Sequence, residues 1–399
     1  MNEDGERNAV RRRLAVSLGL GAIVLLGIAI ALSGGGGHGR RPVATKPNTP
    51  TGPISPPPPP TSPPPLLGVS VNRLFLDRTY SPAKIDAQLS ALERTGASDA
   101  RCDALWEAAE PVAPVGGVHH YDWTFADSIA GALARHRLRW LPIIDYTAAW
   151  AQSIPGQDHS PPRDPASYAA YAGAFAARYG PGGSFWAEHP AIPARPVTAF
   201  EIWNEPDGGH FWLPASDPPA YAALYAAAHT AIKAADPAGR VLIGGVTNPP
   251  VFLPAIIAAR PDLRGQIDGV AVHPYGPSPP AIVAAIRTDR TVLRSLSLAS
   301  VPLYVTEFGW TPRPRGAQDW LPARLRPGYI AETITALAHT NCNVGGIFLY
   351  TWVTPQHDPA NGFDWFGIHP PGGGHTEAEA GFAAGIRAAK QAGPPLNVC

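Results

Sequence analysis

Charged residues and cysteines are both scarce in this chain. Only 16% of the 399 residues are Asp, Glu, Lys or Arg, the formal net charge is zero, and no basic run occurs after the first fifty residues. This composition argues against a nucleic-acid partner. The three cysteines form no CxxC pair and no HExxH motif is present. We therefore expect no catalytic metal ion.

Motifs of two common α/β enzyme classes are also missing. There is no GxSxG sequence, so a serine nucleophile on a sharp strand-to-helix turn is not expected. No glycine-rich phosphate loop follows the first strand-like run, "LGVSVN" at residues 67–72. A nucleotide cofactor is therefore not expected, and a doubly wound nucleotide-binding sheet is disfavoured.

The cysteines can be interpreted one by one. Cys102 lies in a strand-like run and is read as a small core residue. Cys342 and Cys399 can join the C-terminal tail to the domain if the protein lies outside the cell, and an unpaired tail thiol is the alternative.

One long hydrophobic run is present, at residues 14–32, and it contains no charged side chain. Nineteen residues at helical rise cover roughly 30 Å, the thickness of one hydrocarbon core. Arg11, Arg12 and Arg13 precede it, which keeps residues 1–13 in the cytoplasm. Its length favours an uncleaved transmembrane anchor over a cleaved signal segment. We expect a single-pass protein of the cell membrane with its main domain outside the cell, or alternatively a secreted one.

Residues 33–65 form a linker rich in glycine and proline. Four consecutive glycines lie near its start, and residues 56–65 are almost all proline. Such a segment has too few apolar residues to form a core and is expected to be disordered, with an extended polyproline II stretch. It would hold the following domain away from the membrane.

From residue 66 to residue 399, strand-like apolar runs alternate with helical ones. Eight such alternations predict a single (β/α)₈ TIM barrel, an α/β fold, in preference to a doubly wound sheet. The predicted strands are residues 67–72, 97–103, 139–145, 197–204, 240–246, 268–275, 301–308 and 344–352.

Polar and aromatic residues occur at almost every predicted strand end. In a barrel these ends open on one face, where catalytic groups gather. Glu205 ends the fourth strand and Glu307 the seventh, so the two should face each other across the barrel mouth. Two carboxyl groups at about 5–5.5 Å, one protonated and one ionised, are the machinery of a retaining glycosidase. The other residues at these ends are Asn72, Arg101, Asp103, Asp145, Asn204, His273, Tyr275 and Trp352.

Several motifs at the strand ends resemble those of a known group. "WNEP" (203–206), "HPY" (273–275), "VTEFGW" (305–310) and "YTW" (350–352) are similar to motifs of clan A of the glycoside hydrolases. "YDWTFAD" (121–127) with "LPIIDYTAAWA" further resembles family 39 and neighbouring families such as family 5. The likeness covers roughly residues 68–368. It implies cleavage of a β-linked oligo- or polysaccharide with retained configuration, without metal or organic cofactor.

The resemblance also implies roles for individual residues. Glu205 would be the acid/base and Glu307 the nucleophile, with Asn204 bonded to the 2-hydroxyl of the reacting sugar. Tyr275 would hold an oxygen of the nucleophile, and His273 would line the same subsite.

Two further roles follow from the same resemblance. Arg101 would pair with Glu307 or with substrate, and Trp352 would form a platform beneath the reacting sugar. A transglycosidase and a non-catalytic carbohydrate-binding barrel remain alternatives.

Four other acids are expected to be structural. Glu201 precedes Glu205 by four residues within the same predicted strand, so it should lie inside the barrel and pair with a buried cation such as Arg101, or with backbone. Glu107, Glu110 and Asp145 are expected to be solvated loop carboxylates or local caps, with a third acid of the site as the alternative.

Overall fold

The computed structural model describes residues 65–399 except 314–318 and 392. The predicted cytoplasmic segment 1–13, the membrane segment 14–32 and the linker up to residue 64 lie outside the described residues. Within the described part of the chain, no helix has both the length and the apolarity needed to span a bilayer.

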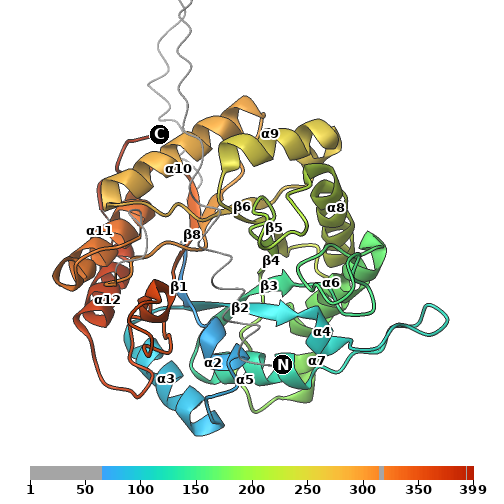
Figure 1. Ribbon diagram of the computed structural model, residues 1–399, viewed down its shortest axis with the longest axis horizontal. Helices are drawn as coiled ribbons and strands as arrows, with labels where there is room; N and C mark the ends of the chain where they lie inside the picture. Colours follow the sequence, from blue (N-terminus) through green and yellow to red (C-terminus); the bar gives the residue numbers. More distant parts are fainter. Residues whose placement is uncertain (1–64, 314–318, 392) are drawn as a thin grey trace, which may run out of the picture. The chain divides into compact units, whose positions relative to one another are not determined.

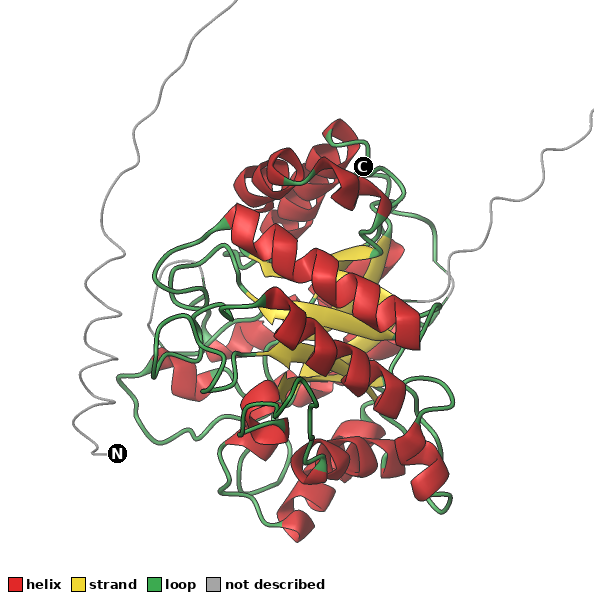
Figure 2. Ribbon diagram, turned by 90° about the vertical axis from the view of Figure 1, so that its right-hand side faces the viewer, coloured by secondary structure: helices red, strands yellow, loops and turns green. Residues whose placement is uncertain are grey.

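Eight parallel strands form a closed barrel in which every strand pairs with its neighbour in sequence and β8 returns to β1. Figure 1 looks along this barrel, and Figure 2 shows the helices packed outside the strands. The expected (β/α)₈ fold is therefore confirmed. The strands are β1 (Leu66–Ser70), β2 (Asp99–Leu105), β3 (Arg139–Asp145), β4 (Ala199–Asn204), β5 (Arg240–Val246), β6 (Gly269–Val272), β7 (Leu303–Val305) and β8 (Val344–Leu349).

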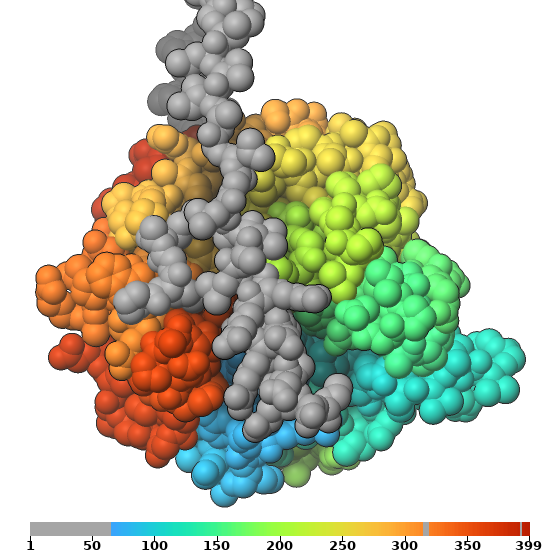
Figure 3. Space-filling model, in the orientation of Figure 1, coloured from blue at the N-terminus to red at the C-terminus, as the bar shows by residue number. Residues whose placement is uncertain are grey.

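Helices follow one another round the outside in chain order, as the colours of the space-filling view also show (Figure 3). Several begin with Ser or Asp at the N-cap followed directly by Pro, as at Ser81 and Asp164, whose side chains accept backbone N–H groups. The helices are α2 (Asn72–Leu76), α3 (Pro82–Arg94), α4 (Trp106–Ala109), α5 (Thr124–Arg135), α6 (Pro165–Tyr179), α7 (Ser184–Glu188), α8 (Pro218–Ala235), α9 (Pro249–Ala259), α10 (Pro279–Ser295), α11 (Arg326–His339) and α12 (Glu377–Ala389).

The barrel interior changes from apolar to charged along the strands. Its apolar layer is made of Leu66, Leu141, Ala199, Leu242, Ala271, Tyr304 and Phe348. Alternate residues of a strand share one face, so the residues two positions further on point inward one layer nearer the carboxyl ends. These are Glu201 on β4, His273 directly after β6 and Thr306 directly after β7. The apolar layer thus closes the barrel beneath a polar one.

Several strands are shorter than expected, β6 and β7 most of all. β6 ends at Val272 and β7 at Val305, whereas the sequence runs suggested strands to residues 275 and 308. His273, Tyr275 and Glu307 therefore lie just beyond the last regular pairing. Asn72 likewise begins α2 and does not end β1. The apolar runs continue past the ladder because residues at the barrel mouth are buried by one another as well as by the sheet.

A disulfide bond joins Cys342 to Cys399, which confirms the bridged alternative. The tail is also paired through a bridge between Thr340 and Leu396. Cys102 is free and fully buried on β2, as expected for a core residue.

Replacement of Cys399 by Ser should lower the free energy of unfolding by about 2–4 kcal/mol, because the bond closes a loop of 57 residues and restricts the unfolded chain. Urea unfolding measures the loss. Reducing agent should bring the parent protein to the same midpoint and leave Cys399→Ser unchanged. A parent midpoint that does not respond to reductant would contradict a stabilising bond.

Candidate active site

A buried ion pair crosses the inside of the barrel. Arg101 donates from Nε to Glu201 Oε2 at 2.8 Å and from Nη2 to Glu201 Oε1 at 2.9 Å, and neither residue is exposed. Such a pair withstands desolvation only when its geometry is good and its remaining atoms are bonded. Glu201 Oε1 also accepts from the backbone N–H of Gly245 at 2.9 Å. The expectation that Glu201 is a structural acid paired with Arg101 is confirmed.

The same guanidinium also holds Glu307. Nη1 of Arg101 donates to Glu307 Oε1 at 2.6 Å, and the Tyr275 hydroxyl donates to Oε2 at 2.8 Å. Burial opposes ionisation of Glu307, but the charges of His273 and Arg101 and these hydrogen bonds outweigh it and lower its pKa. The contacts expected of Arg101 and Tyr275 are therefore present, and Glu307 is held as a carboxylate.

Asn204 is the third partner of the guanidinium. Its Oδ1 accepts from Arg101 Nη2 at 2.8 Å, and the residue is 8% exposed at the end of β4. The bond fixes the amide so that its Nδ2 group faces away from Arg101 and is available as a donor.

Glu205 lies on a loop with an unusual backbone. Its φ is +46°, in the left-handed region that non-glycine residues seldom occupy, and such conformations concentrate at functional sites. The loop is held by Asp207, whose carboxylate accepts from the backbone N–H groups of Thr247 at 2.9 Å and Asn248 at 2.6 Å. Glu205 is therefore placed by the β5 loop, and its side chain remains partly exposed.

His273 connects Glu205 to the buried network. Its Nδ1 lies 2.8 Å from Glu205 Oε1, and its Nε2 lies 3.2 Å from Thr306 Oγ1. The single proton of the Thr306 hydroxyl is donated to Glu201 Oε1 at 3.2 Å. Nε2 must therefore carry a proton and donate it to Thr306. The remaining proton lies between Nδ1 and Glu205, as a carboxylic acid donating to imidazole or an imidazolium donating to carboxylate.

The charges around His273 favour its protonated form. Burial lowers the pKa of His273, but the negative charge of Glu307 and the bond and charge of Glu205 raise it above its ordinary value. A proton is thus retained at the Glu205–His273 pair close to Glu307.

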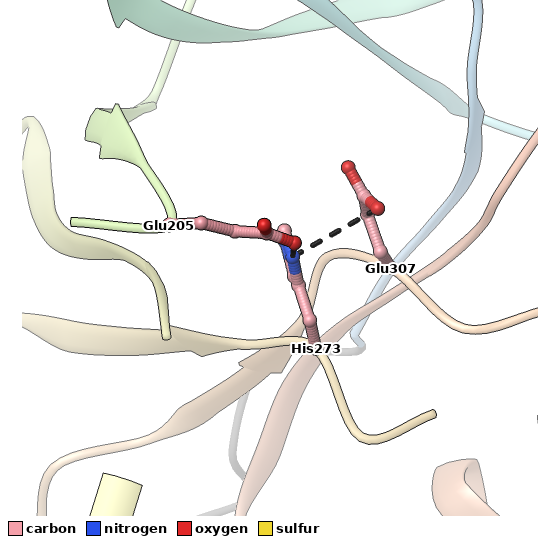
Figure 4. A group of neighbouring side chains, drawn as sticks. All are labelled: Glu205, His273 and Glu307. Carbon is pink, nitrogen blue, oxygen red and sulfur yellow. Dashed lines mark hydrogen bonds and ion pairs between the residues drawn. The ribbon is translucent and has the colours of Figure 1, made fainter. Parts of the chain in front are cut away.

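The two glutamates approach closely. One carboxylate oxygen from Glu205, one from Glu307 and a ring nitrogen of His273 all lie within 4.8 Å of one another. Figure 4 shows Glu205 and Glu307 extending toward each other with His273 between them. This closest approach of their oxygens is compatible with the separation of about 5–5.5 Å between the carboxyl groups of retaining glycosidases.

The same three side chains also have the spacing of a metal site. Both oxygens of Glu307 already accept hydrogen bonds, from Arg101 and from Tyr275. A guanidinium at 2.6 Å also places a fixed positive charge where a cation would have to bind. The donor set therefore fits proton transfer better than metal binding.

Trp352 does not lie where the sequence suggested. It is 0% exposed, its indole N–H donates to Gln88 Oε1 at 2.8 Å, and its ring stacks on His369 at 4.7 Å. No face is left for a sugar, so its expected role as a platform is wrong. Tyr350, directly after β8, is only partly buried and packs against Phe366 at 5.3 Å. The motif has two aromatic residues, and the sequence did not show which one faces the site.

The acids expected to be solvated divide into two groups. Glu107 is exposed and accepts from the backbone N–H of Ala149. Glu110 is 0% exposed, accepts from the indole of Trp106 at 2.8 Å and pairs with His119 at 2.7 Å. Asp145 is also 0% exposed. The expectation of a solvated carboxylate is therefore wrong for Glu110 and Asp145.

A glycine on β5 makes room for His273. A Cβ atom at Gly245 would lie 2.1 Å from His273 Nε2 and 2.4 Å from its Cε1. Gly245 is thus a site residue that the motifs did not reveal, although the double glycine of "GGV" marked the position as unusual.

Known structures share this fold. The GH39 enzyme from Xanthomonas axonopodis pv. citri matches with a TM-score of 0.62 and 22% identity over 80% of this chain and 65% of that chain. A monomeric β-xylosidase from Caulobacter crescentus CB15 matches with a TM-score of 0.61 and 20% identity over 80% and 67%. A GH5_18 structure from Bifidobacterium longum, in complex with Manβ1-4GlcNAc, matches with a TM-score of 0.59 and 12% identity over 83% of this chain and 80% of that chain.

At these identities the likeness concerns the fold, and the chain spans about two thirds of the length of the first two neighbours. The resemblance to clan A glycoside hydrolases inferred from the strand-end motifs is confirmed at that level. No protein-family model matches the chain. No curated protein matches it either.

Gly245→Ala should reduce kcat/KM by about 10–100-fold, because the added methyl group displaces His273 from Glu205 and Thr306. Gly265→Ala is the matched control, since nothing lies within 4 Å of a Cβ there. Hydrolysis of an aryl β-glycoside measures both variants. Equal rates in the two would show that the position of His273 does not matter.

Proposed function

We propose that this protein is a retaining glycoside hydrolase that cleaves O-glycosidic bonds of a β-linked oligo- or polysaccharide. The observation that carries the proposal is the approach of Glu205 and Glu307 oxygens to within 4.8 Å at the mouth of the barrel. The held carboxylate of Glu307 and the retained proton beside Glu205 give the two acids different protonation states, which a double displacement requires.

In the first step Glu307 attacks the anomeric carbon and the glycosidic C–O bond breaks. Glu205 gives its proton to the departing oxygen, and a glycosyl ester of Glu307 forms. In the second step Glu205 takes a proton from water, whose oxygen attacks the anomeric carbon and releases Glu307. Esterification removes the negative charge of Glu307, so the proton shared by Glu205 and His273 is held less strongly and Glu205 can act as a base.

Substrate contacts are assigned to the residues around this pair. Asn204 donates to the sugar's 2-hydroxyl, His273 lines the same subsite, and Tyr350 takes the platform role in place of Trp352. The β-linkage is supported by the neighbours, which include a β-xylosidase, an exo-β-1,4-mannosidase and β-1,4-galactanases. Activity on a panel of aryl glycosides would identify the particular sugar.

Glu307→Ala should lower kcat by more than about 1,000-fold, because no group remains to form the covalent intermediate. Azide should restore turnover and yield the α-glycosyl azide, since a small anion attacks from the face that Glu307 occupied. Glu205→Ala is the matched variant and should retain far more activity on substrates with a good leaving group than on poor ones. Normal turnover by Glu307→Ala would eliminate it as the nucleophile.

We also propose that the protein is exported and anchored in the cell membrane through residues 14–32. The uncharged run after three arginines and the Cys342–Cys399 bond support this, because disulfides persist in oxidising compartments. In cells expressing the full chain, the intact protein should remain with membranes after a high-salt wash and should be digested by protease added to intact spheroplasts. Recovery in the cytosol would contradict export, and a shortened chain in the medium would indicate secretion.

A further inference from the structure

Two carboxyl groups at the barrel mouth are not used by the mechanism above. Asp103 lies on β2 two residues after Arg101, and Asp145 is the last residue of β3. The register pairs Asp103 with Ile143 and Leu105 with Asp145, so the two acids point inward from adjacent strands with a two-residue offset. By this register Asp103 lies one inward layer, and Asp145 two, beyond Arg101 toward the mouth.

Asp145 is buried without a partner among the described residues. It is 0% exposed, and neither of its carboxyl oxygens receives a hydrogen bond from a described group. Burial, and next the charge of Asp103, raise its pKa well above the ordinary range. Burial therefore favours the neutral form of Asp145.

Asp103 is held from the other side by Asn72. Asn72 Nδ2 donates to Asp103 Oδ1 at 2.7 Å, and Asn72 Oδ1 accepts from the backbone N–H of Asp103 at 3.1 Å. Among the described residues no cation forms an ion pair with Asp103, and the guanidinium of Arg101 donates to Glu201, Glu307 and Asn204. Asp103 is 7% exposed.

The position of Asp103 relative to the reacting carbon follows from the barrel. Glu205 follows β4 and Glu307 follows β7, so the anomeric carbon lies between these two strands' ends. The rest of the sugar ring must extend over the strands that supply neither acid. Asp103 belongs to β2, one of these strands, and follows Arg101 by two residues.

We propose that Asp103, held by Asn72, is a specificity-determining residue that accepts hydrogen bonds from hydroxyl groups of the sugar remote from its anomeric carbon. This rests on the proposed function. The substrate class is then a neutral glycone with free hydroxyls at that end. A uronic acid is rejected, because its carboxylate would face Asp103, Glu201 and Glu307 with Arg101 already engaged.

The binding step should depend on pH through Asp103. Burial raises its pKa to about 6, against the opposing effects of Arg101 and of the bond from Asn72, while the charges of Glu307 and Glu201 raise it further. The groups that face it are therefore Asn72 on the β1 side, Arg101 on β2, Asp145 on β3, Glu201 on β4 and Glu307 after β7. A carboxylate accepts more hydrogen bonds than the acid, so sugar affinity should increase as the pH rises through about 6.

The test is calorimetric binding of free monosaccharides to the full chain: glucose, galactose, mannose and xylose, and the 3-deoxy and 4-deoxy forms of the one that binds best. Asp103→Asn should lower the affinity for that sugar at least about tenfold. It should lower the affinity for the deoxy form that lacks the contacted hydroxyl much less. Asp289→Asn is the matched control, since Asp289 is a buried acid on α10 outside the site. It should leave binding unchanged.

Sugar binding indifferent to Asp103→Asn overturns the inference, as does an affinity that does not increase as the pH rises through about 6. Tighter binding of glucosamine than of glucose at pH 7 would also overturn it, in favour of an ammonium group as the partner.

These outcomes separate the two proposals. A protein that hydrolyses no aryl glycoside, yet loses monosaccharide affinity in Asp103→Asn, contradicts the proposed function and supports this inference. A protein that hydrolyses aryl glycosides, with the same sugar preference in the parent and in Asp103→Asn, supports the proposed function and contradicts this inference.

Discussion

The guanidinium of Arg101 is the group on which the site depends. It is fully buried inside the barrel and its bonds reach Glu201 and Asn204 on β4 and Glu307 after β7. A buried charge of this kind is tolerated only while its partners remain in place, since loss of one partner typically costs about 3–5 kcal/mol. The strands that close the barrel and the carboxylate that is to react are therefore stabilised by the same contacts.

This arrangement gives the two glutamates different surroundings. Glu307 receives donors on both oxygens and faces a permanent cation, so it is held ionised. Glu205 contacts only the imidazole of His273 among the side chains described here, on a loop set by Asp207. Thr306 fixes the imidazole tautomer through Glu201. The structural acid Glu201 thus acts on both glutamates, through Arg101 on one and through His273 on the other.

The sequence predicted the barrel and the pair of glutamates well, because both depend on local patterns. Alternating runs give the strands, and a parallel barrel brings all their carboxyl ends to one face whatever the loops do. It was harder to predict from the sequence which side chain of a motif faces the core. "YTW" offers Tyr350 and Trp352, and only the packing on Gln88 and His369 shows that Trp352 faces the core. Asp145 looked like a solvated strand end, since a single strand does not show what its neighbours cover.

The surplus of acids at the mouth has a physical consequence for the proposed reaction. Asp103, Asp145, Glu201, Glu205 and Glu307 lie near two cations, Arg101 and His273. Burial is the largest cause of the raised pKa values of Asp103 and Asp145, and the charges of neighbouring acids add to it, so ionising all of these groups together is costly. Glycosidic cleavage passes through an oxocarbenium-like transition state that carries positive charge on the sugar. Fixed negative charge around the ring is then favourable at the moment of bond breaking and unfavourable before it, which is the difference that accelerates a reaction.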